Sequence, residues 1–214
     1  DNVANLTVTN ANTGTAGVLT IGGHTDTNAN FASLTLSGSI AYTGNFNAAT
    51  GAATVSGATN NQNVTLTLNN ATGNKTVTLG NGTNSVTTGG GADAITSGNG
   101  TNTIVAGAGN DTITLGTGAN TVTGGAGADT IVLGAGSAAS SIVMAAAGDT
   151  YQAATAATIV SGTTALTGID KISGLQIGDT ISLVALSNTF TGANVATIAG
   201  AAGTDVALVR GNFA

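Results

Sequence analysis

The chain has 214 residues and a formal net charge of −6; only 6% of its residues are charged and 3% are aromatic. It contains no cysteine, which excludes a disulfide scaffold, and its three basic residues argue against a nucleic-acid partner. No apolar run approaches the roughly 18 residues that a membrane span requires, so we expect none. Its apolar residues are mostly small, which favours a thin core built from stacked repeats.

The first 70 residues contain short runs in which apolar residues alternate with threonine. Such runs occupy residues 6–9, 18–21, 34–36 and 64–68, and glycine or asparagine ends most of them. This pattern predicts half-buried strands joined by tight turns. The irregular spacing leaves two architectures open for residues 1–70, an imperfect β-solenoid or a small sandwich. The single histidine, His24, follows two glycines, and we expect it to lie alone in a surface turn.

From Gly80 to Leu133 the chain is a series of six nine-residue units, preceded by a degenerate unit at 71–79. Each unit has glycine at its first and third positions, Asn or Asp at its fifth and Val or Ile at its seventh. Paired glycines allow a turn with positive φ and close approach of the backbone. The branched residue that follows predicts a short strand with one side chain pointing inward.

These units resemble the glycine-rich nonapeptide repeat of RTX proteins, GGxGxDxUx. Residues 124–132 match this pattern in full, and residues 88–96 and 106–114 match except at the first glycine. The resemblance implies an all-β fold, a right-handed parallel β-roll over residues 71–153 in which two nonapeptides make one turn. It also implies Ca²⁺ in the turns, held by Asp carboxylates and Gly carbonyls.

The fifth position of the units alternates strictly between Asp and Asn. With two units per turn, one edge of the roll carries Asp93, Asp111 and Asp129, which we call the Asp edge. The other edge carries Asn84, Asn102 and Asn120 and is called the Asn edge. Carboxylates stacked about 5 Å apart, the strand spacing, repel one another unless cations lie between them. The alternation therefore predicts calcium on the Asp edge.

The two ends of the Asp edge can also be read from the spacing. A two-residue insertion near residues 138–140 would place Asp149 next in the row, and one turn before Asp93 stands Lys75. Lys75 could end the row by placing its ammonium where the next ion would lie. By resemblance, the glycine carbonyl ligands are those of Gly89, Gly91, Gly107, Gly109, Gly125 and Gly127. For the Asn edge we expect a dry ladder of amides, with a second row of calcium sites as the open alternative.

Residues 166–186 are similar to the stretch that follows the roll in RTX proteins. Long apolar side chains appear here, at Leu175, Ile177, Ile181, Leu183 and Leu186. An open roll must protect its last strands from water and from pairing with other chains, so residues 154–214 are expected to form a β cap. In the family such regions hold a type I secretion signal. The absence of a starting Met and of a signal peptide suggests a fragment of a longer protein.

Motifs of catalysis are missing from the sequence. H-E-x-x-H, G-x-S-x-G and the P-loop pattern do not occur, and we expect no enzymatic activity. Threonines flank many inward residues, as on ice-binding solenoids, but Ala94, Val105 and Val132 interrupt the rows.

The sequence as a whole favours a structural, extracellular, calcium-binding β-roll. A composition rich in Ala, Thr, Gly and Asn and poor in Lys is similar to that of type I-secreted bacterial surface-layer proteins. This resemblance implies folding and self-assembly on calcium binding, with copies of the chain and cell-surface polysaccharide as candidate partners. Two alternatives stay open: a region of an RTX adhesin, or the calcium-binding C-terminal domain of a secreted hydrolase or toxin.

Overall fold

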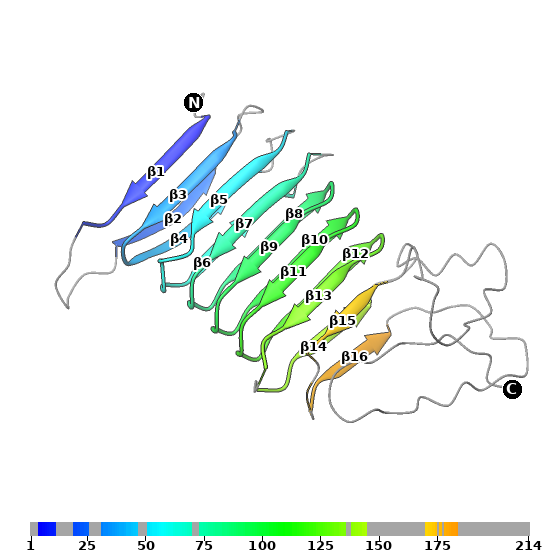
Figure 1. The fold of residues 1–214 in the computed structure, drawn as a ribbon. Coiled ribbons are helices and arrows are strands. Elements are labelled where there is room, and N and C mark those ends of the chain that lie inside the picture. Colours follow the sequence, from blue (N-terminus) through cyan, green and yellow to red (C-terminus); the bar gives the residue numbers. More distant parts are fainter. Residues whose placement is uncertain are drawn as a thin grey trace, which may run out of the picture.

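The computed structural model describes residues 4–11, 19–25, 31–46, 51–69, 73–135, 138–144, 170–174, 176 and 178–183. In these residues it contains strands and no helices, and the strands form two sheets of eight (Figure 1). One sheet contains β1 (Asn5–Thr9), β3 (Ser33–Ser37), β5 (Ala53–Gly57), β7 (Lys75–Leu79), β9 (Ala94–Ser97), β11 (Thr112–Leu115), β13 (Thr130–Leu133) and β15 (Lys171–Ser173). The other contains β2 (Leu19–Thr25), β4 (Ile40–Asn45), β6 (Val64–Thr67), β8 (Ser85–Gly90), β10 (Thr103–Ala108), β12 (Thr121–Ala126), β14 (Ser141–Met144) and β16 (Thr180–Leu183).

The chain alternates between the two sheets, and every strand pairs in parallel with the strand two places along, as in a β-solenoid. In the nonapeptide region the repeat is 18 residues, since Thr112 pairs with Ala94 on one side and with Thr130 on the other. This confirms the prediction of two units per turn. The thin, layered architecture follows from the sequence, because each nine-residue unit is long enough for only one short strand and one turn.

The described parts of residues 1–70 continue the same two sheets with longer and less regular repeats. Leu34 pairs with Val55, and Tyr42 pairs with Val64, in parallel. Of the two predicted architectures, the solenoid is therefore correct for the described residues in this range, and the sandwich is wrong. His24 lies in strand β2, at a register shift, and not in the turn that its neighbouring glycines suggested.

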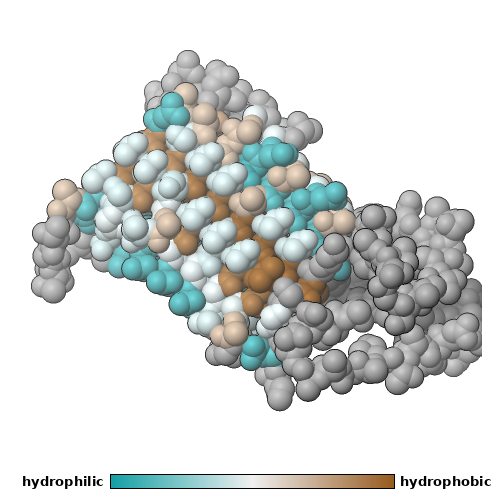
Figure 2. All heavy atoms as spheres, in the orientation of Figure 1, coloured by the Kyte–Doolittle hydropathy of each residue, from teal (hydrophilic) through white to brown (hydrophobic). Residues whose placement is uncertain are grey.

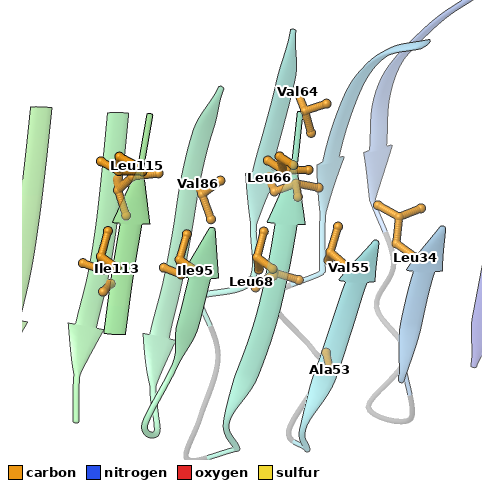
Figure 3. Close-up of a cluster of buried hydrophobic side chains, with 14 of the residues drawn as sticks. Leu34, Ala53, Val55, Val64, Leu66, Leu68, Val86, Ile95, Ile113 and Leu115 are labelled. Atoms are coloured by element: carbon orange, nitrogen blue, oxygen red, sulfur yellow. The ribbon is translucent and has the colours of Figure 1, made fainter. Parts of the chain in front are cut away.

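The core is a stack of inward-pointing apolar residues between the sheets. In the nonapeptide region each strand contributes a fully buried Val or Ile, such as Val86, Ile95 and Ile113 (Figure 3). The earlier turns hold larger side chains, and the rings of Phe31 and Phe46 stack there with centroids 4.1 Å apart. The core thus holds aromatic rings in the N-terminal turns, whereas each nonapeptide strand contributes a Val or Ile and a second buried residue that is often small, such as Thr88, Ser97 or Ala106.

The outward positions of the strands carry short polar residues in rows. Thr54, Thr76, Ala94, Thr112 and Thr130 stack across the strands of one sheet. Figure 2 shows one such face as regular lines of pale side chains. Val105 and Val132 are exposed within these rows, at 38% and 36% of their surface.

The last strands show where the regular repeat ends. Thr121 pairs with Ser141, 20 residues on, which confirms the predicted two-residue insertion. Strands β15 and β16 then add one strand to each sheet. Of the expected cap, Leu175, Ile177 and Leu186, with most of residues 154–214, lie outside the described residues. In the described part of the chain no helix could span a membrane.

Candidate metal centre

The turns of the two edges differ in backbone conformation although their sequences follow the same pattern. On the Asp edge the first and third glycines of each unit have positive φ, for example 114° at Gly107 and 134° at Gly109. Their counterparts on the Asn edge, such as Gly98 and Gly100, are not among the positive-φ glycines that the structure describes. The Asp edge therefore uses left-handed glycine turns, which side chains other than glycine rarely adopt.

The aspartates form one continuous row in which each carboxylate contacts the turn before it. Oδ1 of Asp111 accepts the main-chain N–H of Asp93 at 2.8 Å, and Oδ1 of Asp129 accepts that of Asp111 at 2.8 Å. Asp93, Asp111 and Asp129 are only 1–2% exposed. Three carboxylates thus stack on one edge, as the alternation predicted, and the structure adds that all three are buried.

The second oxygen of each of these carboxylates is left without a partner. Oδ2 of Asp93, Asp111 and Asp129 is buried and accepts no hydrogen bond from the protein. A buried carboxylate oxygen with neither a hydrogen bond nor a counter-charge is costly. A cation placed against these oxygens would therefore be stabilised, and at Asp93 the Lys75 ammonium already contributes positive charge.

The cost of burying these carboxylates also raises their pKa values. Burial, together with the neighbouring charges of Asp129, Asp93 and Asp170, raises the pKa of Asp111 from 3.8 to about 7, against the N–H bond from Asp93. Burial likewise raises the pKa of Asp129 to about 6. Without a cation, Asp111 therefore takes up a proton near pH 7 and Asp129 near pH 6.

The Asn edge solves the same packing problem with amide N–H groups. Nδ2 of Asn102 donates to the carbonyls of Gly98 and Gly100 at 3.0 and 2.7 Å, and to Oδ1 of Asn120 at 2.9 Å. Asn120 repeats these contacts with its own two glycines, at 3.2 and 2.7 Å. Each amide thus satisfies two glycine carbonyls of its own turn, and the expectation of an amide ladder on this edge is confirmed.

Replacing the amide by a carboxylate removes the donor from this arrangement. The glycines four and two residues before Asp111 are Gly107 and Gly109, the counterparts of the two that Asn102 satisfies. A carboxylate has no N–H to donate, so the Asp edge offers only oxygen acceptors. Ca²⁺ binds six to eight oxygens from carboxylates and carbonyls, and this set of ligands suits it. Gly89, Gly91, Gly125 and Gly127 stand at the equivalent positions beside Asp93 and Asp129.

The carboxylates lie in single file. In the described parts of the chain, three acidic side chains nowhere converge on one point. Each interval between turns therefore offers two carboxylates, and the remaining ligands of an ion there would be main-chain carbonyls or water. This is a ligand set for a hard cation and not for zinc, which prefers nitrogen and sulfur.

Asp170 takes the place in the row that the sequence analysis gave to Asp149. The N–H of Asp129 donates to Oδ1 of Asp170 at 2.7 Å, and β15, which begins at the next residue, pairs with β13. Asp149 itself lies outside the described residues. Asp170-Lys171-Ile172 repeats the order of an Asp, a polar residue and an isoleucine found in Asp129-Thr130-Ile131, but nothing in the spacing shows which turn it joins.

Sequence reasoning also missed two members of the Asn edge, Ser97 and Asp179. Ser97 accepts from Nδ2 of Asn84 at 2.9 Å and donates to Oδ1 of Asn102 at 2.8 Å, so it joins two turns from a core position. At the far end, the N–H of Ser140 donates to Oδ1 of Asp179 at 2.6 Å. Neither residue occupies the fifth position of a complete nonapeptide, and the repeat pattern therefore gave no signal.

Comparison with known families agrees with this geometry. The family model of the RTX calcium-binding nonapeptide repeat, in four copies, matches residues 78–113 and 105–137. Searches of curated proteins and of solved structures returned no match. The chain therefore contains RTX calcium-binding repeats folded as a β-solenoid, and Ca²⁺ is the ion for which these repeats are known.

Proposed function

We propose that the chain is a structural, extracellular calcium-binding β-roll of a bacterial surface-layer protein, and that it folds and assembles when it meets calcium after secretion. The observation that carries the calcium-dependent part is the row of buried, unpartnered Oδ2 atoms of Asp93, Asp111 and Asp129. Three intervals between successive carboxylates, from Asp93 to Asp170, are the proposed calcium sites.

The proposal of folding after export rests on the balance between core and charge. In the nonapeptide turns, the core is free of aromatic rings and built from small and aliphatic side chains, whereas each turn also buries a carboxylate. Such a core cannot offset the repulsion between stacked carboxylates unless calcium binding contributes to folding. Calcium is scarce inside cells and abundant outside them. RTX repeat proteins are typically secreted, which fits an extracellular location.

Circular dichroism tests calcium-dependent folding. The calcium-loaded chain should give a β-sheet spectrum that loses much of its amplitude when EGTA removes the ion, and should regain it when calcium is restored. Magnesium serves as the control, because its smaller coordination sphere does not suit this ligand set. An identical spectrum with and without EGTA would contradict the proposal.

The proposed surface-layer role is supported by the shape and chemistry of the outer faces. Figure 2 shows one face with regular rows of short, mostly uncharged side chains. Val105 in β10 and Val132 in β13 are exposed, one in each sheet. Faces of this kind can pack side by side with little desolvation of charge, and copies of the chain are the proposed partners. The absence of catalytic motifs agrees with a structural role.

Electron microscopy in the presence and absence of calcium tests assembly. Ordered sheets should form in millimolar calcium, and Val105→Asp should reduce them by placing a charge on the packed face without altering the buried row. Separate particles at millimolar calcium would count against the surface-layer role. They would leave the calcium-dependent β-roll to the dichroism experiment.

A further inference from the structure

The Asp edge ends in a residue of opposite charge. We propose that Lys75 is a built-in counter-cation, whose ammonium replaces a calcium ion where the calcium-binding turns meet the N-terminal turns. The inference rests on the proposed function in so far as that function assigns the following intervals to metal.

Lys75 occupies the position in the row that precedes Asp93. Strands β7 and β9 pair with Thr76 opposite Ala94, so Lys75 lies beside Asp93. The N–H of Lys75 donates to Oδ1 of Asp93 at 2.6 Å, which is the contact that each later turn makes with the next carboxylate. Lys75 is fully buried, which is rare for a lysine unless a partner of opposite charge accompanies it.

The ammonium contacts the carbonyl that a cation would use. Nζ of Lys75 donates to the carbonyl oxygen of Gly73, two residues earlier. On the Asn edge the equivalent carbonyl, that of Gly100, receives the amide of Asn102. In the turns of Asp93 and Asp111 the equivalent carbonyls are those of the proposed calcium sites. The carbonyl two residues before each row position thus contacts an ammonium where that position is Lys and an amide where it is Asn. Where the position is Asp, the proposed partner is a calcium ion.

The residues before Lys75 in this row explain why a cation of the protein's own is placed here. Ala53 pairs with Lys75 in the preceding turn and is buried, so the row is apolar before Lys75 and acidic after it. If position 75 held a neutral residue, a calcium ion between that position and Asp93 would find only one carboxylate. A lysine supplies positive charge towards Asp93, while its aliphatic stem suits an apolar neighbour.

A double-mutant cycle tests the pairing. Lys75→Met keeps the length and the apolar stem but removes the charge, and Asp93→Asn removes the charge of its partner. In saturating calcium, Lys75→Met should lower the folding equilibrium constant roughly a hundredfold, because it removes the positive charge on the side of Asp93 that faces away from the calcium interval between Asp93 and Asp111. In the Asp93→Asn background, Lys75→Met should lower the folding equilibrium constant by less than about tenfold. Equal losses in both backgrounds would overturn the proposal.

A second variant tests the exchange of ammonium for metal. Lys75→Asp extends the row by one carboxylate, so equilibrium dialysis should find one more bound calcium ion than in the parent. Its stability should fall more in EGTA than in calcium. No additional ion, or an equal loss under both conditions, would contradict the proposal. If the parent chain itself bound no calcium, the proposed function would fail, whereas the cycle would still report the pairing of Lys75 with Asp93.

Discussion

At the scale of single residues, the two edges differ by the replacement of an amide NH₂ by a carboxylate oxygen. Asn102 and Asp111 have nearly the same shape, and both are buried. The amide donates to two glycine carbonyls and to the next amide, and so closes its turn without help. The carboxylate keeps an unpartnered oxygen and depends on a cation. One side chain type thus decides whether an edge is closed by its own hydrogen bonds or keeps an oxygen that a cation could bind.

The raised pKa values predict how pH affects the calcium-free protein. The pKa of Asp111 is about 7 and that of Asp129 about 6 in the folded state, against 3.8 ordinarily, so folding favours the protonated forms. Above about pH 7 both carboxylates are charged, and the full cost of burying their charges lowers the free energy of unfolding. This cost is progressively removed as the pH falls from about 7 towards about 4. In calcium-stripped buffer, the urea midpoint should therefore be higher at about pH 5 than at about pH 8.

Asp111→Asn provides the control for this prediction. The variant lacks the group with the most strongly raised pKa, so its urea midpoint should change less over the same range. A midpoint that falls on acidification from about pH 8 to about pH 5 would contradict the assignment. In the presence of calcium, protons compete with the metal, and the calcium affinity should decrease as the pH falls.

At the scale of the elements, the glycine turns of the Asp edge limit which residues the repeat accepts. Gly109 has a φ of 134°, and a Cβ there would overlap the carbonyl of Gly91 in the turn before. Gly109→Ala should therefore cost at least about 1–3 kcal/mol of folding free energy and weaken calcium binding. Urea unfolding in calcium measures the loss.

Gly51→Ala is the matched control. Gly51 has no positive φ, and a Cβ there would meet no atom within 4 Å. The change should leave the urea midpoint almost unaltered. Equal effects of the two substitutions would show that the turns of the Asp edge are not specially constrained.

The regular elements were predictable from the sequence because their signal is local. The period of nine places a strand in each unit, and the alternation of Asp111 with Asn102 places the two on opposite edges. The continuation of the row was not predictable in the same way. Asp170 enters the stack 41 residues after Asp129, and short-range spacing does not indicate where a chain rejoins a sheet after so long a segment. Pairing of whole strands determines that register.

At the scale of the whole molecule, the solenoid joins two regimes of stability. The N-terminal turns are stabilised by a larger core that includes Phe31, Tyr42 and Phe46. The nonapeptide turns have a core without aromatic rings, an amide ladder and the row of carboxylates to which we assign calcium. The long-range pairing of the N-terminal strands explains why the sequence did not distinguish a solenoid from a sandwich in residues 1–70. Apolar alternation there indicates strands, but the partners of those strands lie 20 or more residues away.

The number of calcium ions bound by three chains tests the account most directly. Asp111 borders two of the three proposed intervals, so Asp111→Asn should lose two ions in equilibrium dialysis, and its amide should make the calcium-free protein more stable than the parent. Asn102→Ala removes a residue of the opposite edge; it should retain all three ions, although it destabilises the fold by leaving the carbonyls of Gly98 and Gly100 unsatisfied. Equal calcium loss from the two variants would contradict the assignment of calcium to the Asp edge.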